Sequence, residues 1–182
     1  MVHARFDRRW ACLSLALLAS VLTHSAQAQD GGSAGAPPND ECRFGLVAFN
    51  GNTNFSTDGA TDTVDGEEFP ECDESAYADI YHDVYYRYTA TCSGELKVDL
   101  CNGGFDTKVA VYDGCVCPAP SPPLGCNDDG ACAITGRSQL TVPAVQGSCY
   151  TIRLGGYNGA FGSGVMNLSC NAIIPMGACC NT

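Results

Sequence analysis

Short runs in which apolar and polar residues alternate recur along the chain after residue 39. The clearest run, Glu95–Cys101, places Leu96, Val98 and Leu100 on one face and charged residues on the other. Tyr81–Ala90 alternates in the same way and is rich in aromatic residues. A period of two residues is typical of strands with one buried face, and no window after the leader shows the 3.6-residue period of an amphipathic helix. The pattern therefore predicts an all-β chain.

The same pattern predicts about eight strands in all. They are Phe44–Phe49, Phe55–Gly59, Tyr81–Ala90, Glu95–Cys101, Asp106–Asp113, Ser138–Val142, Cys149–Gly155 and Val165–Cys170. The strand Asp106–Asp113 has apolar side chains on both faces, which predicts a central strand covered on both sides. Turns are expected at Asn50–Asn54 and Pro143–Ser148, a long acidic loop at 58–83, and no central strand in the proline-rich segment Cys115–Cys132. This number of strands predicts a disulfide-rich two-sheet β-sandwich or jelly roll.

The N-terminal residues predict an exported protein. Residues 1–28 have arginines, then an apolar run of thirteen residues from Trp10 to Leu22, then Ala26-Gln27-Ala28, which together are typical of a cleaved signal peptide. The run is short for a membrane anchor, and the pair Arg8-Arg9 leaves a twin-arginine signal open. Residues 29–38 predict a flexible linker, residues 39–172 one domain, and residues 173–182 the start of a truncated cysteine-rich segment, although its cysteines could also pair back into the domain. The expected location is secreted, extracellular or periplasmic.

Removal of residues 1–28 leaves six basic and nineteen acidic residues, a net charge of −13. Nucleic acid and anionic membranes are therefore not expected partners, because both bind cationic surfaces, and no membrane insertion is expected after cleavage. His82 is then the only histidine, which disfavours a multi-histidine zinc site. A dense, even set of cysteines in an exported chain predicts disulfides whose connectivity the sequence does not choose. The cysteines of the domain are Cys42, Cys72, Cys92, Cys101, Cys115, Cys117, Cys126, Cys132, Cys149 and Cys170.

Several segments, in order, resemble the pre-peptidase C-terminal domain, a β-sandwich module appended to secreted bacterial proteases and collagenases. They are Asn39-Asp40, Tyr85–Ala90, Asp106–Asp113, Cys126–Gly130, Ser138–Val142 and Gly147–Tyr157. The dense cysteines depart from most members and resemble the variants in secreted planctomycete-type proteins. The resemblance covers about residues 39–170. It implies a non-catalytic accessory module, and it carries no protease activity over to this chain because no peptidase segment is present.

Two acidic groups are candidate calcium ligands, because Ca²⁺ prefers carboxylate and carboxamide oxygens. The resemblance implies the first, since some relatives bind calcium at the start of the domain and in a following acidic loop. The corresponding residues here are Asn39, Asp40, Asp58, Asp62 and Asp65. The second group is Asn127, Asp128 and Asp129, with Asp106 or Asp113 brought near by the fold. Its sequence does not match an EF-hand loop, and Asn-Asp-Asp-Gly is also a typical turn sequence. A solvated acidic loop is the alternative for the first group.

The sequence favours binding over catalysis. His82 is followed by Asp83, but no G-x-S-x-G motif supplies a nucleophile, so a small hydrolase is the least favoured hypothesis. We expect a secreted non-catalytic module for adhesion or substrate targeting that binds an extracellular protein or polysaccharide, with calcium as a stabilising ion. The alternative is a carbohydrate-binding module that uses loop aromatics. Tyr157, in the glycine-rich segment, is the aromatic residue we expect to contact such a ligand.

Overall fold

A computed structural model describes residues 35–63, 79–119 and 122–173. Contacts between Cα atoms divide the chain into two units, Met1–Asp30 and Gly31–Thr182, and all of the described residues belong to the second. The candidate calcium ligand Asp65, the predicted disulfide cysteine Cys72 and the tail that follows Ile173 lie outside the described residues. Within the described ranges, no helix is both long and apolar enough to cross a bilayer.

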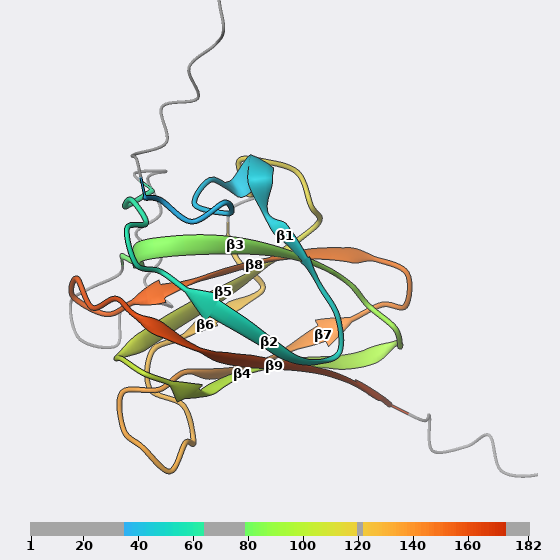
Figure 1. Cartoon of the computed structure of the whole chain (residues 1–182). Coiled ribbons are helices and arrows are strands. Elements are labelled where there is room, and N and C mark those ends of the chain that lie inside the picture. The colour runs from blue at the N-terminus through green and yellow to red at the C-terminus, as the bar shows by residue number, and fades with distance from the viewer. Residues whose placement is uncertain (1–34, 64–78, 120–121, 174–182) are drawn as a thin grey trace, which may run out of the picture. The chain divides into compact units, whose positions relative to one another are not determined.

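The fold is an all-β sandwich of two sheets, as the sequence predicts (Figure 1). The five-stranded sheet has the order β1 (Leu46–Ala48), β3 (Tyr81–Thr89), β8 (Cys149–Gly156), β5 (Thr107–Asp113) and β6 (Gly125–Asn127). The four-stranded sheet has the order β2 (Gly51–Ser56), β9 (Ser163–Ala172), β4 (Gly94–Gly103) and β7 (Gln139–Ala144). All neighbours pair antiparallel except β1 and β3, which are parallel. A 3₁₀ turn, η1 (Cys42–Phe44), precedes β1.

The core lies between the two sheets and is built from the alternate residues that the sequence pattern marks as apolar. Leu96, Val98 and Leu100 of β4 are fully buried there, opposite Val109 and Val111 of β5. The side chains between them along β5 point to the outer face, where Ala110 and Tyr112 pack with Ile80 in a second, smaller cluster. β5 is therefore covered on both faces, which confirms the prediction for Asp106–Asp113.

The prediction of a turn at Asn50–Asn54 is wrong, because most of that segment belongs to β2. Gly51–Ser56 pairs residue by residue with β9, from Gly51 opposite Leu168 to Ser56 opposite Ser163. Glycine and asparagine favour turns locally, but here the pairing with a strand more than a hundred residues away decides the conformation. Pro143, expected in a turn, lies inside β7 opposite Glu95, and it is tolerated there because β7 is an edge strand.

Disulfides tie the loops to both sheets. The four that join described cysteines are Cys42–Cys117, Cys92–Cys170, Cys101–Cys132 and Cys115–Cys149. Cys126, in β6, is disulfide-bonded as well. The prediction of disulfides is confirmed for these nine cysteines. Two of the bonds, at Cys115 and Cys117, fasten the proline-rich excursion that cannot be held by a central ladder of hydrogen bonds.

Candidate functional site

A groove of about 630 Å³ lies between the edge strands β1 and β2, on one open side of the sandwich. Figure 1 shows the two strands on this side, joined by the turn at Asn50. The apolar part of its lining is formed by Pro37, Pro38, Leu46, Phe55 and Tyr86. Its polar part is formed by Asn39, Asn54, Ser56, Asp58, Ser163 and Gly164. The groove therefore combines an apolar wall with a polar rim, as ligand sites in proteins commonly do.

Local hydrogen bonds fix both ends of the groove. Tyr88 Oη donates to Asn50 Oδ1 at 2.6 Å, and Asn50 Nδ2 donates to Thr91 Oγ1 at 2.9 Å, so the β1–β2 turn is attached to β3 and the residues that follow it. At the other end, Asn39 Nδ2 donates to the Tyr85 carbonyl at 2.9 Å and the Tyr85 amide donates to the Asn39 carbonyl at 2.8 Å. These bonds hold the segment that carries Pro37 and Pro38 against the five-stranded sheet.

The polar end of the groove is a small cluster of oxygen atoms around Asp58. Ser56 Oγ donates to Asp58 Oδ2 at 3.0 Å, Ser163 Oγ lies 3.4 Å from the same oxygen, and the Asp58 amide donates to Ser56 Oγ at 3.1 Å. Asp58 is exposed and, of the residues that the structure describes, is the only charged one that lines the groove. Its carboxylate is oriented by two hydroxyl groups and offers a negative charge to a ligand.

The strand that forms one edge of the groove is unusually apolar for an exposed strand. Leu46 is 43% exposed, Val47 64% and Phe49 74%, whereas Ala48 points into the core. Just before β1, the guanidinium of Arg43 lies 4.6 Å from the ring centroid of Phe44, itself exposed. An exposed cluster of large apolar side chains at a sheet edge is a feature of interaction surfaces.

The N-terminal calcium candidates use their oxygens to hold the loop after β2. Asn39 and Asp40 are buried. Asp40 Oδ1 accepts from the Thr61 amide at 2.6 Å and its Oδ2 from Thr61 Oγ1 at 3.0 Å, while Asp62 Oδ1 accepts from the His82 amide at 2.7 Å. Asp58 faces its serine neighbours instead. The carboxylate oxygens of Asp40, Asp58 and Asp62 therefore do not converge on one point where a calcium ion could bind. In the described part of the chain no three acidic, histidine or cysteine side chains lie together, so calcium binding stays a prediction.

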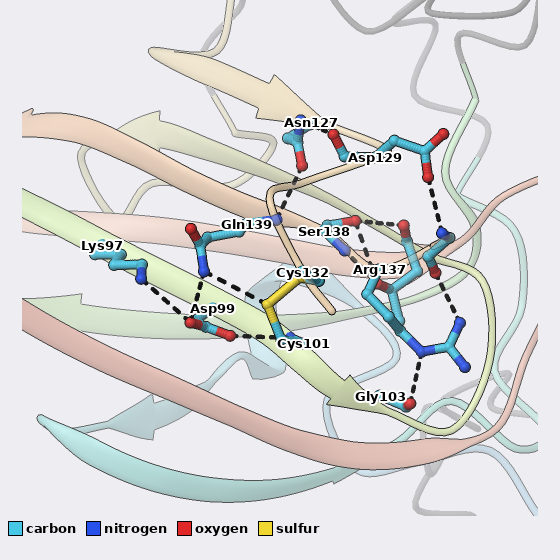
Figure 2. Close-up of a disulfide and its surroundings, with 12 residues drawn as sticks. Lys97, Asp99, Cys101, Gly103, Asn127, Asp129, Cys132, Arg137, Ser138 and Gln139 are labelled. Atoms are coloured by element: carbon cyan, nitrogen blue, oxygen red, sulfur yellow. Dashed lines mark hydrogen bonds and ion pairs between the residues drawn. A yellow bond between two sulfur atoms is a disulfide. The ribbon is translucent and has the colours of Figure 1, made fainter. Parts of the chain in front are cut away.

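The second candidate group lies at the end of β6, beside the disulfide Cys101–Cys132 (Figure 2). Asn127 Oδ1 accepts from the Gln139 amide at 2.9 Å, and Asn127 Nδ2 donates to the Asp129 carbonyl at 3.2 Å. Asp129 Oδ1 accepts from the Gly136 amide at 2.9 Å, and Asp128 is buried. The side chains of Asn127 and Asp129 thus bond the backbone, which is what the turn interpretation of this sequence requires.

The sequence predicts that either Asp106 or Asp113 lies near this second group, and in the structure Asp106 does. Burial and the nearby Asp129 carboxylate raise the pKa of Asp106 above its ordinary value, and the Arg137 guanidinium partly opposes them. Arg137 is itself held by the Gly103 carbonyl, to which its Nε donates at 2.7 Å (Figure 2). Two carboxylates and one cation therefore share this end of the sandwich.

Tyr157 lies at the start of a tight turn between β8 and β9. Its carbonyl accepts from the Ala160 amide at 2.9 Å, and the two residues between them, Asn158 and Gly159, have φ of 46° and 80°. Phe161 follows and is 58% exposed, with its ring edge-on to His82 at 5.1 Å between centroids. The loop therefore presents an exposed aromatic residue beside the one that the sequence singled out. Because His82 Nδ1 lies 2.9 Å from the Ala60 carbonyl, the imidazole is held against the loop after β2.

Sequence reasoning missed most of the groove. Pro37 and Pro38 had been assigned to a linker, and Leu46 and Phe55 to ordinary strand positions. Nothing in the local sequence marks them, because the groove exists only where the edges of two sheets meet. The exposed run of apolar residues in and after β1 is the one signal, and a strand pattern alone does not reveal which strands lie at edges.

No protein-family model and no curated protein matches the chain. Among solved structures, it is similar to the pre-peptidase C-terminal domain of a collagenase from Bacillus anthracis, with 9% identity and a TM-score of 0.43, over 69% of this chain and 94% of that one. It is also similar to a periplasmic inhibitor of g-type lysozyme from Aeromonas hydrophila, with 12% identity and a TM-score of 0.36, over 68% of this chain and 95% of that one. The first is a domain of the family that the sequence segments resemble.

Proposed function

We propose that the chain is an exported, non-catalytic module that binds an extracellular protein through the groove between β1 and β2. The observation that carries the proposal is the combination of an apolar lining with the single charged residue Asp58, next to exposed apolar side chains on β1. The disulfides support an oxidising compartment, because bonds of this density are rare in reducing cytosol. Adhesion or substrate targeting is the role that such a surface suits.

The test uses a panel of collagens and other matrix proteins, with the full chain as the soluble component. Leu46→Asp places a charge in the apolar lining and should weaken binding at least tenfold, since burial of a leucine contributes about 1.5–3 kcal/mol. Leu124→Asp is the matched control, because Leu124 is also 43% exposed but lies outside the groove. Equal effects of the two variants, or no binding by the unmodified chain, would overturn the proposal.

A second candidate function is carbohydrate binding, favoured by the exposed Phe161 in the same loop as Tyr157. Exposed aromatic rings suit the apolar faces of sugars. Under this proposal a glycan array should give a signal that Tyr157→Ala or Phe161→Ala abolishes, while Leu46→Asp leaves it unchanged. Loss of the glycan signal in Leu46→Asp but not in the loop variants would contradict it.

A further inference from the structure

β1 has one edge that no described strand covers. β1 stands at the end of the five-stranded sheet, and β3 is its strand neighbour on one side. Within the described residues no strand pairs with the other side. An edge strand of this kind presents backbone N–H and C=O groups that another extended chain can pair with.

β1 is only three residues long, which limits pairing at its edge, but it carries no charged residue or proline. Natural proteins usually guard an exposed edge with a lysine, a proline or another charged residue. The residues Leu46–Ala48 have none of these, and the side chains that remain outside the core are apolar and 43–64% exposed. The opposite edge of the four-stranded sheet, β7, contains Pro143. The edge strand beside the groove therefore differs from β7, because it contains neither a proline nor a charged residue.

We propose that an extended, cationic peptide segment of the partner binds by adding a strand to the free edge of β1. This inference rests on the proposed function and names the partner's chemistry. Side chains of a strand alternate between its two faces, so every second residue of the added strand would point into the groove. There they meet Leu46, Phe55 and Tyr86, which suit apolar side chains, and Asp58, which suits a lysine or arginine.

The charge of the groove decides between this partner and a second copy of the chain. Among the described residues Asp58 is the only charged one in the lining, and the chain after residue 28 has nineteen acidic and six basic residues. A second copy pairing edge to edge would bring the uncharged strand Leu46–Ala48, and two strongly acidic chains would repel each other. A cationic peptide instead gains charge-assisted hydrogen bonds with a carboxylate that Ser56 and Ser163 already orient.

The first experiment pans a phage-displayed library of random twelve-residue peptides against the full chain. Enriched peptides should alternate apolar residues and include a lysine or arginine in phase with them. Synthetic copies should lose at least tenfold in affinity with Asp58→Asn, and little with Asp113→Asn, an exposed aspartate at the end of β5 that does not line the groove. Enriched peptides with no cation, or with equal sensitivity to both variants, would overturn the inference.

The second experiment tests strand addition without changing the protein. Methylation of one backbone nitrogen at a time along the selected peptide should weaken binding at least tenfold at alternate positions, because only every second N–H of an added strand faces β1. If N-methylation leaves the affinity unchanged at every position while Asp58→Asn still weakens binding, strand addition is wrong but binding in the groove is not. The proposed function has its own test: it is wrong if Leu46→Asp leaves binding to the matrix proteins unchanged.

Discussion

Arg153 Nε donates to Asp83 Oδ2 at 2.7 Å, in an ion pair on the outer face of the five-stranded sheet. Both side chains are buried, Asp83 completely. Burial is the largest single influence and lowers the pKa of Arg153, but the Asp83 carboxylate, together with Tyr85 and Tyr112, raises the pKa of the guanidinium above its ordinary value. The pair also holds the loop after β2, because Asp83 Oδ1 accepts from the Thr63 amide at 2.9 Å and Arg153 Nη2 donates to the Thr63 carbonyl at 3.1 Å.

Asp83→Ala should destabilise the protein by about 3–5 kcal/mol, because it leaves Arg153 buried without its counter-charge. Urea unfolding monitored by tyrosine fluorescence measures the change. Asp113→Ala, at the exposed end of β5, is the control and should change stability by less than about 0.5 kcal/mol. The double variant Asp83→Leu with Arg153→Met should recover much of the loss, and a double variant as unstable as Asp83→Ala would contradict this account.

Asp106→Asn should stabilise the protein near neutral pH and leave it unchanged in acid. The raised pKa means that folding favours the protonated carboxyl, so the contribution of Asp106 is fully present below its unfolded value of 3.8 and is lost as the pH rises through the folded pKa. The gain at pH 7 should be below about 1 kcal/mol, since the group is largely solvated. Stability curves from pH 3 to pH 7 measure it. Asp129→Asn should reduce the same pH dependence, and a gain that is equal at all pH values would argue against it.

Gly156→Ala should destabilise by about 3 kcal/mol or more, since a Cβ at this position would overlap the Ala160 carbonyl oxygen. Gly159→Ala, in the β8–β9 turn, is the matched control: its φ is 80°, but no atom lies within 4 Å of the added carbon, so the cost should be about 1 kcal/mol. Thermal unfolding of both variants decides the comparison, and a reversed order would refute the close approach.

Removal of the Cys42–Cys117 disulfide by paired alanine substitutions should cost about 2–5 kcal/mol, because the bond closes a loop of 75 residues in the unfolded chain. The same change at Cys101–Cys132, which closes 31 residues, should cost about 1 kcal/mol less. Guanidinium unfolding without reductant compares the two. The opposite order would show that native contacts near the bonds, rather than loop length, determine their contribution.

The calcium hypothesis predicts that the midpoint of thermal unfolding is higher with millimolar calcium than with a chelator, because an ion that binds only the folded state stabilises it. Asp58→Asn combined with Asp62→Asn should remove this difference if the N-terminal group binds the ion, and Asp129→Asn should remove it if the second group does. An unchanged midpoint in the unmodified chain would dispose of both sites.

Local patterns predicted the strands that lie within sheets. β3, β4, β5 and β8 carry clear apolar alternation because their side chains pack in the core whatever the topology. Only the end of β2, Phe55 and Ser56, falls in a predicted strand, because Gly51–Asn54 is polar and becomes a strand only through β9. The same limit applies to the candidate sites. The sequence shows that Asp40 and Asp62 are acidic, but not that their oxygens bond the backbone at Thr61 and His82.

The pairing of β2 with β9 also sets the order of events during biosynthesis. Gly51 pairs with Leu168, so β2 stays without its partner until β9 has been made, more than a hundred residues later. One edge of β4 also stays unpaired until β9 has been made, since residues 94–103 pair with 164–172. Contacts between such distant residues slow folding and expose unpaired strands in the meantime. Under the proposed function the chain is exported, and a polypeptide that cannot close the four-stranded sheet before β9 emerges would remain threadable through a translocation channel.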